Sequence, residues 1–247
     1  MSDAPNLSKP FTGRRRIHVV GGGTFNHVRP HLALAAPAFG RLARMLASVL
    51  QRLVRPVTDH EVLLHLTWMA TAGGTIPTQD PYPTAGRIIT NDDMLQLLTH
   101  IADDAATRIV FMTSAVADFE GAIIREAPPT GAYATHFEPS GLHEKRLDSS
   151  KPHRLKLLPA PKIIPSLRAR RKDVFVVACK VTTSASEVDM RYRGAKLAHT
   201  ADVQLVLVND LHTRVNLIVD EKGKLLAKSM VRPEIVQDLV RLALERT

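Results

Sequence analysis

Short runs of β-branched and aliphatic residues alternate along the chain with segments in which apolar residues recur every three or four positions. The first run, residues 17–24 (IHVVGGGT), ends in glycines and predicts a buried strand followed by a turn. Beyond Pro37, apolar residues keep a helical spacing as far as Leu53, which predicts an amphipathic helix opening at Pro37. The chain therefore opens with a strand, a glycine turn and a helix.

The same alternation continues to the end of the chain. Further strands are predicted at 61–70, 173–181 and 202–210, and residues 108–119 predict a strand that runs into a polar turn. Helices are predicted after Asn91, at 161–171, at 184–200 and beyond Pro233, and a hairpin is predicted at 214–230. Strands that alternate with helices predict an α/β fold, Rossmann-like, with a mostly parallel sheet, helices on both faces and a C-terminal hairpin. Ligands of such sheets bind at the carboxyl ends of the strands.

Residues 120–153 interrupt this rhythm, because prolines and glycines replace any sustained period. A connection of this length predicts a loop or an extended arm or flap, and long loops inside compact domains are usually functional. We expect residues 1–16 to form a flexible basic tail and residues 17–247 to form a single ligase-like α/β domain that carries the 120–153 arm.

Composition narrows the class of protein. The net charge of +9 attracts anions of any kind, including nucleic acid and nucleotides. Only 4% of the residues are aromatic, so the basic clusters 14–16 and 168–172 lack the stacking rings of single-strand binders, which does not favour nucleic acid. One cysteine, no signal-peptide pattern and no long apolar run predict a reduced cytoplasmic protein outside the membrane.

Two glycine turns compete for the role of an anion-binding loop. The turn Gly21-Gly22-Gly23-Thr24 follows a compact strand and precedes a predicted helix, the setting in which backbone N–H groups hold phosphate. An anion contact and a purely structural turn are equally compatible with it. Prolines follow Gly73-Gly74-Thr75 and keep that segment extended, which favours a surface loop. Neither turn has the spacing of a dinucleotide or P-loop motif.

Six short strings occur in a fixed order later in the chain: SAVADF (114–119), EKRLDSS (144–150), LKLLPAPKII (155–164), VACKVTT (177–183), AKL (195–197) and VND (208–210). Together with the first glycine turn and TNDDML (90–95), this ordered set resembles the phosphopantothenoylcysteine synthetase family, the phosphopantothenate–cysteine ligase domain of coenzyme A biosynthesis. The resemblance covers about residues 17–220. No single string is decisive, but the ordered set is fairly specific.

The resemblance implies a homodimeric ligase that uses CTP or ATP with Mg²⁺ to convert the carboxylate of 4′-phosphopantothenate into an acyl-nucleotide, which the amine of cysteine then attacks. Positioned charges carry such phosphoryl chemistry. The implied catalytic residues are Lys145, Asn26 and Asp118, and Arg29, Asn209 and Asp210 are the implied substrate contacts. The implied nucleotide contacts are Gly21, Gly22, Gly23, Thr24, Met112, Thr113, Ser114, Asp118, Lys145, Pro161, Lys162, Ile163, Ile164, Cys179 and Lys196.

Each implied role has a structural alternative. Asp118 can cap a turn, Lys145 and Lys196 can be solvated cations, and Cys179 can be a small buried hydrophobe because no base for a catalytic thiol is identified. The histidines show no metal-binding spacing, so a transition-metal site built by the protein is not expected.

The match also departs from the family pattern after the first glycine turn. Ala33 falls where the family has an asparagine that contacts the activated intermediate, and residues 35–37 (Ala-Ala-Pro) fall where it has Ser-Ser-Gly. A hydrogen bond to a charged group worth about 1.5–3 kcal/mol is therefore missing, unless Asn26 replaces it. Two alternatives to the ligase follow: a nucleotide binder that is non-catalytic or takes a different substrate, and a basic nucleic-acid-binding protein.

Overall fold

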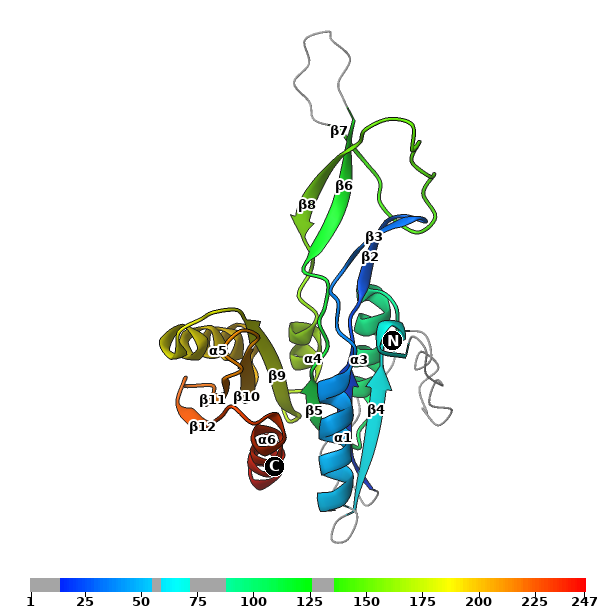
Figure 1. Cartoon of the computed structure of the whole chain (residues 1–247). Helices are drawn as coiled ribbons and strands as arrows, with labels where there is room; N and C mark the ends of the chain where they lie inside the picture. Colours follow the sequence, from blue (N-terminus) through cyan, green and yellow to red (C-terminus); the bar gives the residue numbers. More distant parts are fainter. Residues whose placement is uncertain (1–13, 55–58, 72–87, 126–135) are drawn as a thin grey trace.

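The computed structural model describes residues 14–54, 59–71, 88–125 and 136–247. Within these ranges seven strands form one sheet in the order β12-β11-β10-β9-β5-β1-β4 (Figure 1). Their bounds are β1 Arg15–Gly21, β4 His60–Leu66, β5 Thr107–Met112, β9 Phe175–Thr182, β10 Leu205–Asp210, β11 Asn216–Asp220 and β12 Leu225–Ser229. The predicted Rossmann-like α/β fold is confirmed.

The strand order defines where a ligand can enter. Strands β4, β1, β5, β9 and β10 are parallel, and only β11 and β12 pair antiparallel. The chain passes from β1 outward to β4 and then returns to β5 on the other side of β1, so connections leave β1 and β5 in opposite directions. This switch point opens a crevice at the edge where the parallel strands end, called the carboxyl edge below.

Helices cover both faces of the sheet. The helices α1 (Arg41–Val54) and α6 (Arg232–Glu245) pack on one face, and α3 (Asn91–Asp103), α4 (Ile164–Arg170) and α5 (Glu187–Ala201) pack on the other. Alternate strand residues point to opposite faces, so Ile109 and Phe111 of β5 meet the α1 side while Val110 and Met112 meet the α3 side. Both faces are apolar, as a buried parallel sheet requires.

The described part of the segment predicted as a loop or arm contains strands that form a sheet of their own. Strands β6 (Phe119–Arg125), β7 (His136–Glu138) and β8 (Arg154–Pro159) form a three-stranded antiparallel sheet that projects from the body (Figure 1). A hairpin of β2 (Phe25–Arg29) and β3 (Leu32–Ala35) packs against β6. We call β6, β7, β8 and the 139–153 connection the arm.

Two predicted boundaries are wrong for a physical reason. The first helix starts at Arg41 instead of Pro37, because residues 32–35 pair with β2 and the chain turns at Gly40, whose φ is +68°. The predicted strand 61–70 ends at Leu66, and a short helix, α2 (Trp68–Thr71), follows. None of the helices in the described ranges combines the length and apolar composition needed to cross a bilayer.

A buried hydrogen-bond chain joins β1, β4 and β5 beneath α3. Nδ1 of His18 lies 3.0 Å from Nε2 of His65, and Nε2 of His18 lies 3.1 Å from the Thr107 hydroxyl. The Thr107 hydroxyl donates to the carbonyl of Ile101, so His18 must donate to Thr107 through Nε2 and accept from His65 through Nδ1. Burial and the neighbouring His65 lower the pKa of His18 to about 3, which keeps this imidazole neutral.

The lowered pKa predicts acid sensitivity. Because the unfolded chain binds a proton near pH 6.5 and the folded chain only near pH 3, stability is highest above pH 6.5 and is lost as the pH falls between these values, by a few kcal/mol. His18→Gln keeps one acceptor and one donor but cannot titrate. Denaturant unfolding at pH 7, 5.5 and 4.5 should give a shallower loss for His18→Gln than for the wild type, and parallel curves would contradict this assignment.

Candidate active site at the carboxyl edge

The first glycine turn lies at the end of β1, on the switch point. Its backbone is tied to both neighbouring connections, because Thr67 N–H donates to the carbonyl of Gly21, and Ala115 N–H donates to that of Gly22. Gly21 has no room for a Cβ against Ala43 of α1, and Gly22 has a φ of +106°. Close packing thus explains these glycines, and the anion contact stays a prediction. The turn at 73–75 lies outside the described residues.

Thr24 connects this turn to two other segments. Its hydroxyl donates to Oδ1 of Asn91 at 2.6 Å and accepts from the N–H of Ala117 at 2.9 Å. The Asn91 amide in turn donates to the carbonyl of Ala117. Thr24 is fully buried and joins β1, α3 and the segment after β5, and its nucleotide contact stays a prediction.

The predicted contacts Met112, Thr113 and Ser114 follow the end of β5 beside the turn. Met112 is buried toward α3, while the Thr113 hydroxyl donates to the carbonyl of Val20 on β1. The Ser114 hydroxyl oxygen is buried and has no hydrogen-bond partner within the described part of the chain. Ser114 is therefore the member of this group with hydrogen-bonding capacity left for a ligand.

Asp118 and the predicted segment 161–164 are brought together. Oδ1 of Asp118 lies 2.6 Å from Nζ of Lys162, and both side chains are about two-thirds exposed. Pro161 is also exposed, whereas Ile163 is buried and Ile164 half-buried against the α3 side of the sheet. The exposed ion pair is a small contribution to stability, and a ligand can displace either partner.

Asn26 and Arg29 serve the arm in this structure. The Asn26 amide donates to the carbonyl of Phe119 at the start of β6. Arg29 is buried, and its guanidinium donates to the carboxylate of Glu138 at 2.6 Å and to the carbonyl of Pro139 at 2.6 Å. These bonds fasten the arm to the β2–β3 hairpin, and the catalytic and substrate roles remain predictions.

Within the described part of the chain, neither of the two predicted lysines, Lys145 and Lys196, makes a hydrogen bond or ion pair with the glycine turn. Lys145 is exposed on the arm, in a segment tied to the hairpin through the N–H of Gly141 and the carbonyl of Val28. Lys196 is exposed on α5, on the side of the helix opposite to Met190 and Gly194, which face the sheet.

Asn209 and Asp210 end β10 on opposite faces of the sheet. The Asp210 carboxylate is buried and accepts hydrogen bonds from the hydroxyls of Thr182 and Thr213 and from the N–H groups of Ser184, Ala185, His212 and Thr213. These bonds, led by that from the Thr213 N–H, hold the pKa of Asp210 well below its usual range. Asp210 thus fixes the loops after β9 and β10 and has little capacity left for a substrate.

Cys179 lies on β9 and faces the side covered by α1 and α6. Burial raises the pKa of its thiol to about 12, which favours the protonated thiol over a nucleophilic thiolate, and its nucleotide contact stays a prediction. Within the described ranges, no three His, Cys, Asp or Glu side chains gather in a way that would hold a metal ion.

Two further residues were not identified from the sequence. Arg232 opens α6 at the carboxyl edge, and no motif marks a single arginine at a helix start. His27 lies opposite Ala33 in the hairpin, and its Nδ1 is buried without a partner in the described part of the chain. Pairing register across a hairpin would have been needed to find it.

The chain is similar in structure, but not detectably in sequence, to known proteins. Neither the family models nor the curated proteins matched the sequence. A DNA/pantothenate metabolism flavoprotein from Streptococcus pneumoniae superposes with a TM-score of 0.72 at 17% identity, over 94% of this chain and 100% of that chain. The chain has the fold of this protein.

Two more solved structures agree. The C-terminal domain of the coenzyme A biosynthesis bifunctional protein CoaBC gives a TM-score of 0.60 at 15% identity, over 95% of this chain and 98% of that chain. A Cab2 mutant in complex with phosphopantothenate-cysteine gives 0.60 at 14% identity, over 94% of this chain and 86% of that chain. The resemblance recognised in the ordered strings is thereby confirmed for the fold.

Asp210 and Asp118 should respond differently to the same change. Asp210→Asn replaces an oxygen acceptor by an NH₂ donor among groups that already donate, so its melting temperature should fall by several degrees. Asp118→Asn alters an exposed side chain and should melt close to the wild type. Differential scanning fluorimetry without ligand measures both variants, and equal losses would show that Asp118 also supports the fold.

Proposed function

We propose that this chain is a nucleotide-dependent ligase of the phosphopantothenate–cysteine type. The observation that carries the proposal is the fold shared over nearly the whole chain with a pantothenate metabolism flavoprotein, a coenzyme A biosynthesis protein and a protein in complex with phosphopantothenate-cysteine. The ordered strings support it, because SAVADF, LKLLPAPKII, VACKVTT and VND all end or follow strands that reach the carboxyl edge or its rim.

The proposed reaction has two steps. A carboxylate oxygen of 4′-phosphopantothenate attacks the α-phosphorus of CTP or ATP, and pyrophosphate leaves. The amine nitrogen of cysteine then attacks the acyl carbon, the nucleoside monophosphate leaves and a proton is lost from the nitrogen. Positively charged groups must offset the triphosphate during the first step, and Lys145 and Lys162 are the proposed suppliers.

The described residues of the carboxyl edge do not form a metal site by themselves, so Mg²⁺ would bind there together with the phosphates of the nucleotide. Such ions are usually held by substrate phosphates with one or two carboxylates. Asp118 is the exposed carboxylate among the proposed site residues, and it would take part once Lys162 moves to a phosphate. Bound there, Mg²⁺ would neutralise charge on the triphosphate.

One observation favours the alternative of an altered substrate. Ala33 and Ala35 occupy β3 where the family has polar groups, and they lie opposite His27 and Phe25. Phe25 also packs near Trp68, at 6.0 Å between ring centroids, and half of the Trp68 surface is exposed. This side of the hairpin therefore offers an apolar surface beside the imidazole of His27, which suits an acyl substrate less polar than phosphopantothenate.

Pyrophosphate release tests the ligase. With CTP or ATP, phosphopantothenate and Mg²⁺, the wild type should release about one equivalent of pyrophosphate, and added cysteine should permit many turnovers. Lys145→Ala should reduce the rate by about 10²-fold or more, because it removes a charge from the transition state. Lys151→Ala, also on the arm and paired with Asp148, is the matched control and should keep its rate. No release with any nucleoside triphosphate would contradict the ligase, and stabilisation by a nucleotide without turnover would favour a non-catalytic binder.

We further propose that the arm is the contact of a homodimer. Strand β8 has a neighbour on one side only in the described sheet. Leu155 and Leu157 of β8 and Phe119 of β6 share one face of this sheet and are 38%, 51% and 47% exposed. An open strand edge with exposed leucines is a favourable surface for pairing with a second copy.

Leu157→Glu should raise the dimer dissociation constant at least about tenfold, because the new carboxylate would be buried without a partner. Val188→Glu, on a 75% exposed position of α5, should leave it unchanged. Sedimentation velocity over a concentration series measures both variants. A wild type that sediments as a monomer at every concentration would refute the arm contact.

A further inference from the structure

Arg232, at the start of α6, is half-buried and has no counter-ion among the residues that the structure describes. It forms no ion pair and donates no side-chain hydrogen bond within the described part of the chain. Other partly buried arginines are satisfied: Arg16 pairs with Glu61 and Asp104, and buried Arg171 pairs with Asp173. A guanidinium removed from part of its water with its donors unused is costly to keep, unless a ligand completes it.

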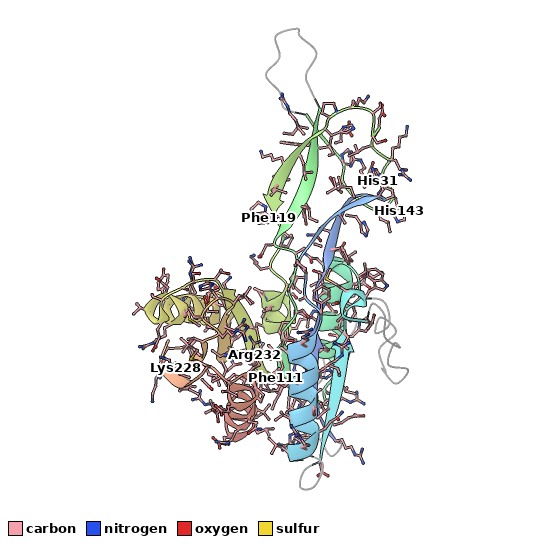
Figure 2. The ribbon with its side chains drawn as sticks, in the orientation of Figure 1. His31, Phe111, Phe119, His143, Lys228 and Arg232 are labelled. Atoms are coloured by element: carbon pink, nitrogen blue, oxygen red, sulfur yellow. The ribbon has the colours of Figure 1, made fainter. Side chains whose placement is uncertain are left out.

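The position of Arg232 is on the carboxyl edge. Strand β12 runs in the same direction as β10, because each is antiparallel to β11, so α6 begins where β10 ends. The charge of Arg232 lowers the pKa of the Cys179 thiol, against the larger effect of burial, which places the guanidinium within electrostatic reach of β9. Figure 2 shows Arg232 toward the middle of the molecule, between the half that carries α5 and the half that carries α1.

The same face carries an unused acceptor. Asn216 is 1% exposed, and its amide donates to the carbonyls of Arg214 and Ser229, just before α6. Its Oδ1 is buried with no partner in the described ranges. Asn209 pairs with Asn216 across β10 and β11, and alternation along β10 points it to the same side.

The starts of α3, α5 and α6 differ in how many of their backbone N–H groups already have a side-chain acceptor. The hydroxyls of Thr90 and Ser186 accept backbone N–H bonds at the starts of α3 and α5, and Asp210 takes the N–H groups before α5. At the start of α6, Val231 offers no side-chain cap. The positive end of the helix dipole lies beside Arg232, and Glu234, the acidic residue of this first turn, has its carboxylate bonded to the Ser229 hydroxyl.

We propose that Arg232 binds the phosphate chain of the nucleotide and that the buried Oδ1 of Asn216 accepts a hydrogen bond from a hydroxyl or amino group of the same ligand. A nucleotide combines both chemistries, since it has anionic oxygens and donor groups in one molecule. The inference rests on the proposed function for the identity of the ligand and adds a phosphate subsite on the face covered by α1 and α6.

The test uses the full chain with inorganic tripolyphosphate, CTP, CMP and cytidine as probes, measured by isothermal titration calorimetry. Arg232→Ala should weaken CTP and tripolyphosphate about 10–100-fold, weaken CMP less and leave cytidine unchanged, because each phosphate adds charge-assisted bonds. The affinity of Arg232→Lys for CTP and tripolyphosphate should lie between those of the wild type and Arg232→Ala, because lysine keeps the charge but lacks the planar guanidinium. The matched control is Arg241→Ala on the same helix. The Arg241 side chain is 63% exposed and pairs with Asp238, so this variant should bind the probes like the wild type.

The outcomes separate this subsite from the ligase itself. Tripolyphosphate binding that depends on Arg232, in a protein that releases no pyrophosphate, would keep the subsite and refute the ligase. Equal binding by Arg232→Ala and the wild type, equal losses for Arg232→Ala and Arg241→Ala, or a wild type that does not bind tripolyphosphate would each overturn the subsite. Melting curves without ligand show whether the variants fold. If Arg232→Ala does not fold, the binding of tripolyphosphate by Arg232→Lys decides whether the subsite exists.

Discussion

The close packing of the first glycine turn is the constraint on which the candidate site depends. Gly21 leaves no space between β1 and Ala43 of α1, and Thr24 links the turn to Asn91 and Ala117. Three connections that are far apart in the sequence are thereby fixed at the switch point. A side chain at Gly21 would push α1 away from the sheet. This would disturb the packing on the face of the sheet on which Arg232 and Cys179 lie.

This packing changes how the carboxyl edge can bind an anion. The Thr24 N–H of the turn donates to the carbonyl of Ala115, so this donor is not free for phosphate as it would be in a loop that runs directly into a helix. The hydrogen-bonding capacity that remains belongs to side chains around the turn, such as the buried hydroxyl of Ser114.

The sequence predicted the fold class well, because a parallel sheet buried on both faces needs apolar runs and its helices need an apolar stripe. It failed where pairing is long-range. The hairpin β2–β3 is rich in alanine and lacks clear alternation, and β6 pairs with β8 across a proline-rich stretch, so neither follows from local pattern. Motif order located Asp118 and Lys162 separately, but only the fold shows that they neutralise each other. Arg232 has no motif, and its significance lies in the missing partner, which no sequence displays.

The distribution of paired and unpaired cations decides where the net positive charge can act. At the opposite edge, where the parallel strands begin, the basic clusters of the sequence meet carboxylates: Arg16 pairs with Glu61 and Asp104, Arg170 with Asp103, and Lys172 with Asp202. A polyanion binding there would have to compete with these carboxylates, and exposed pairs of this kind gain little from the exchange. At the carboxyl edge Arg232 has no such competitor in the described chain, so an anion that reaches it would not have to displace an ion-paired carboxylate.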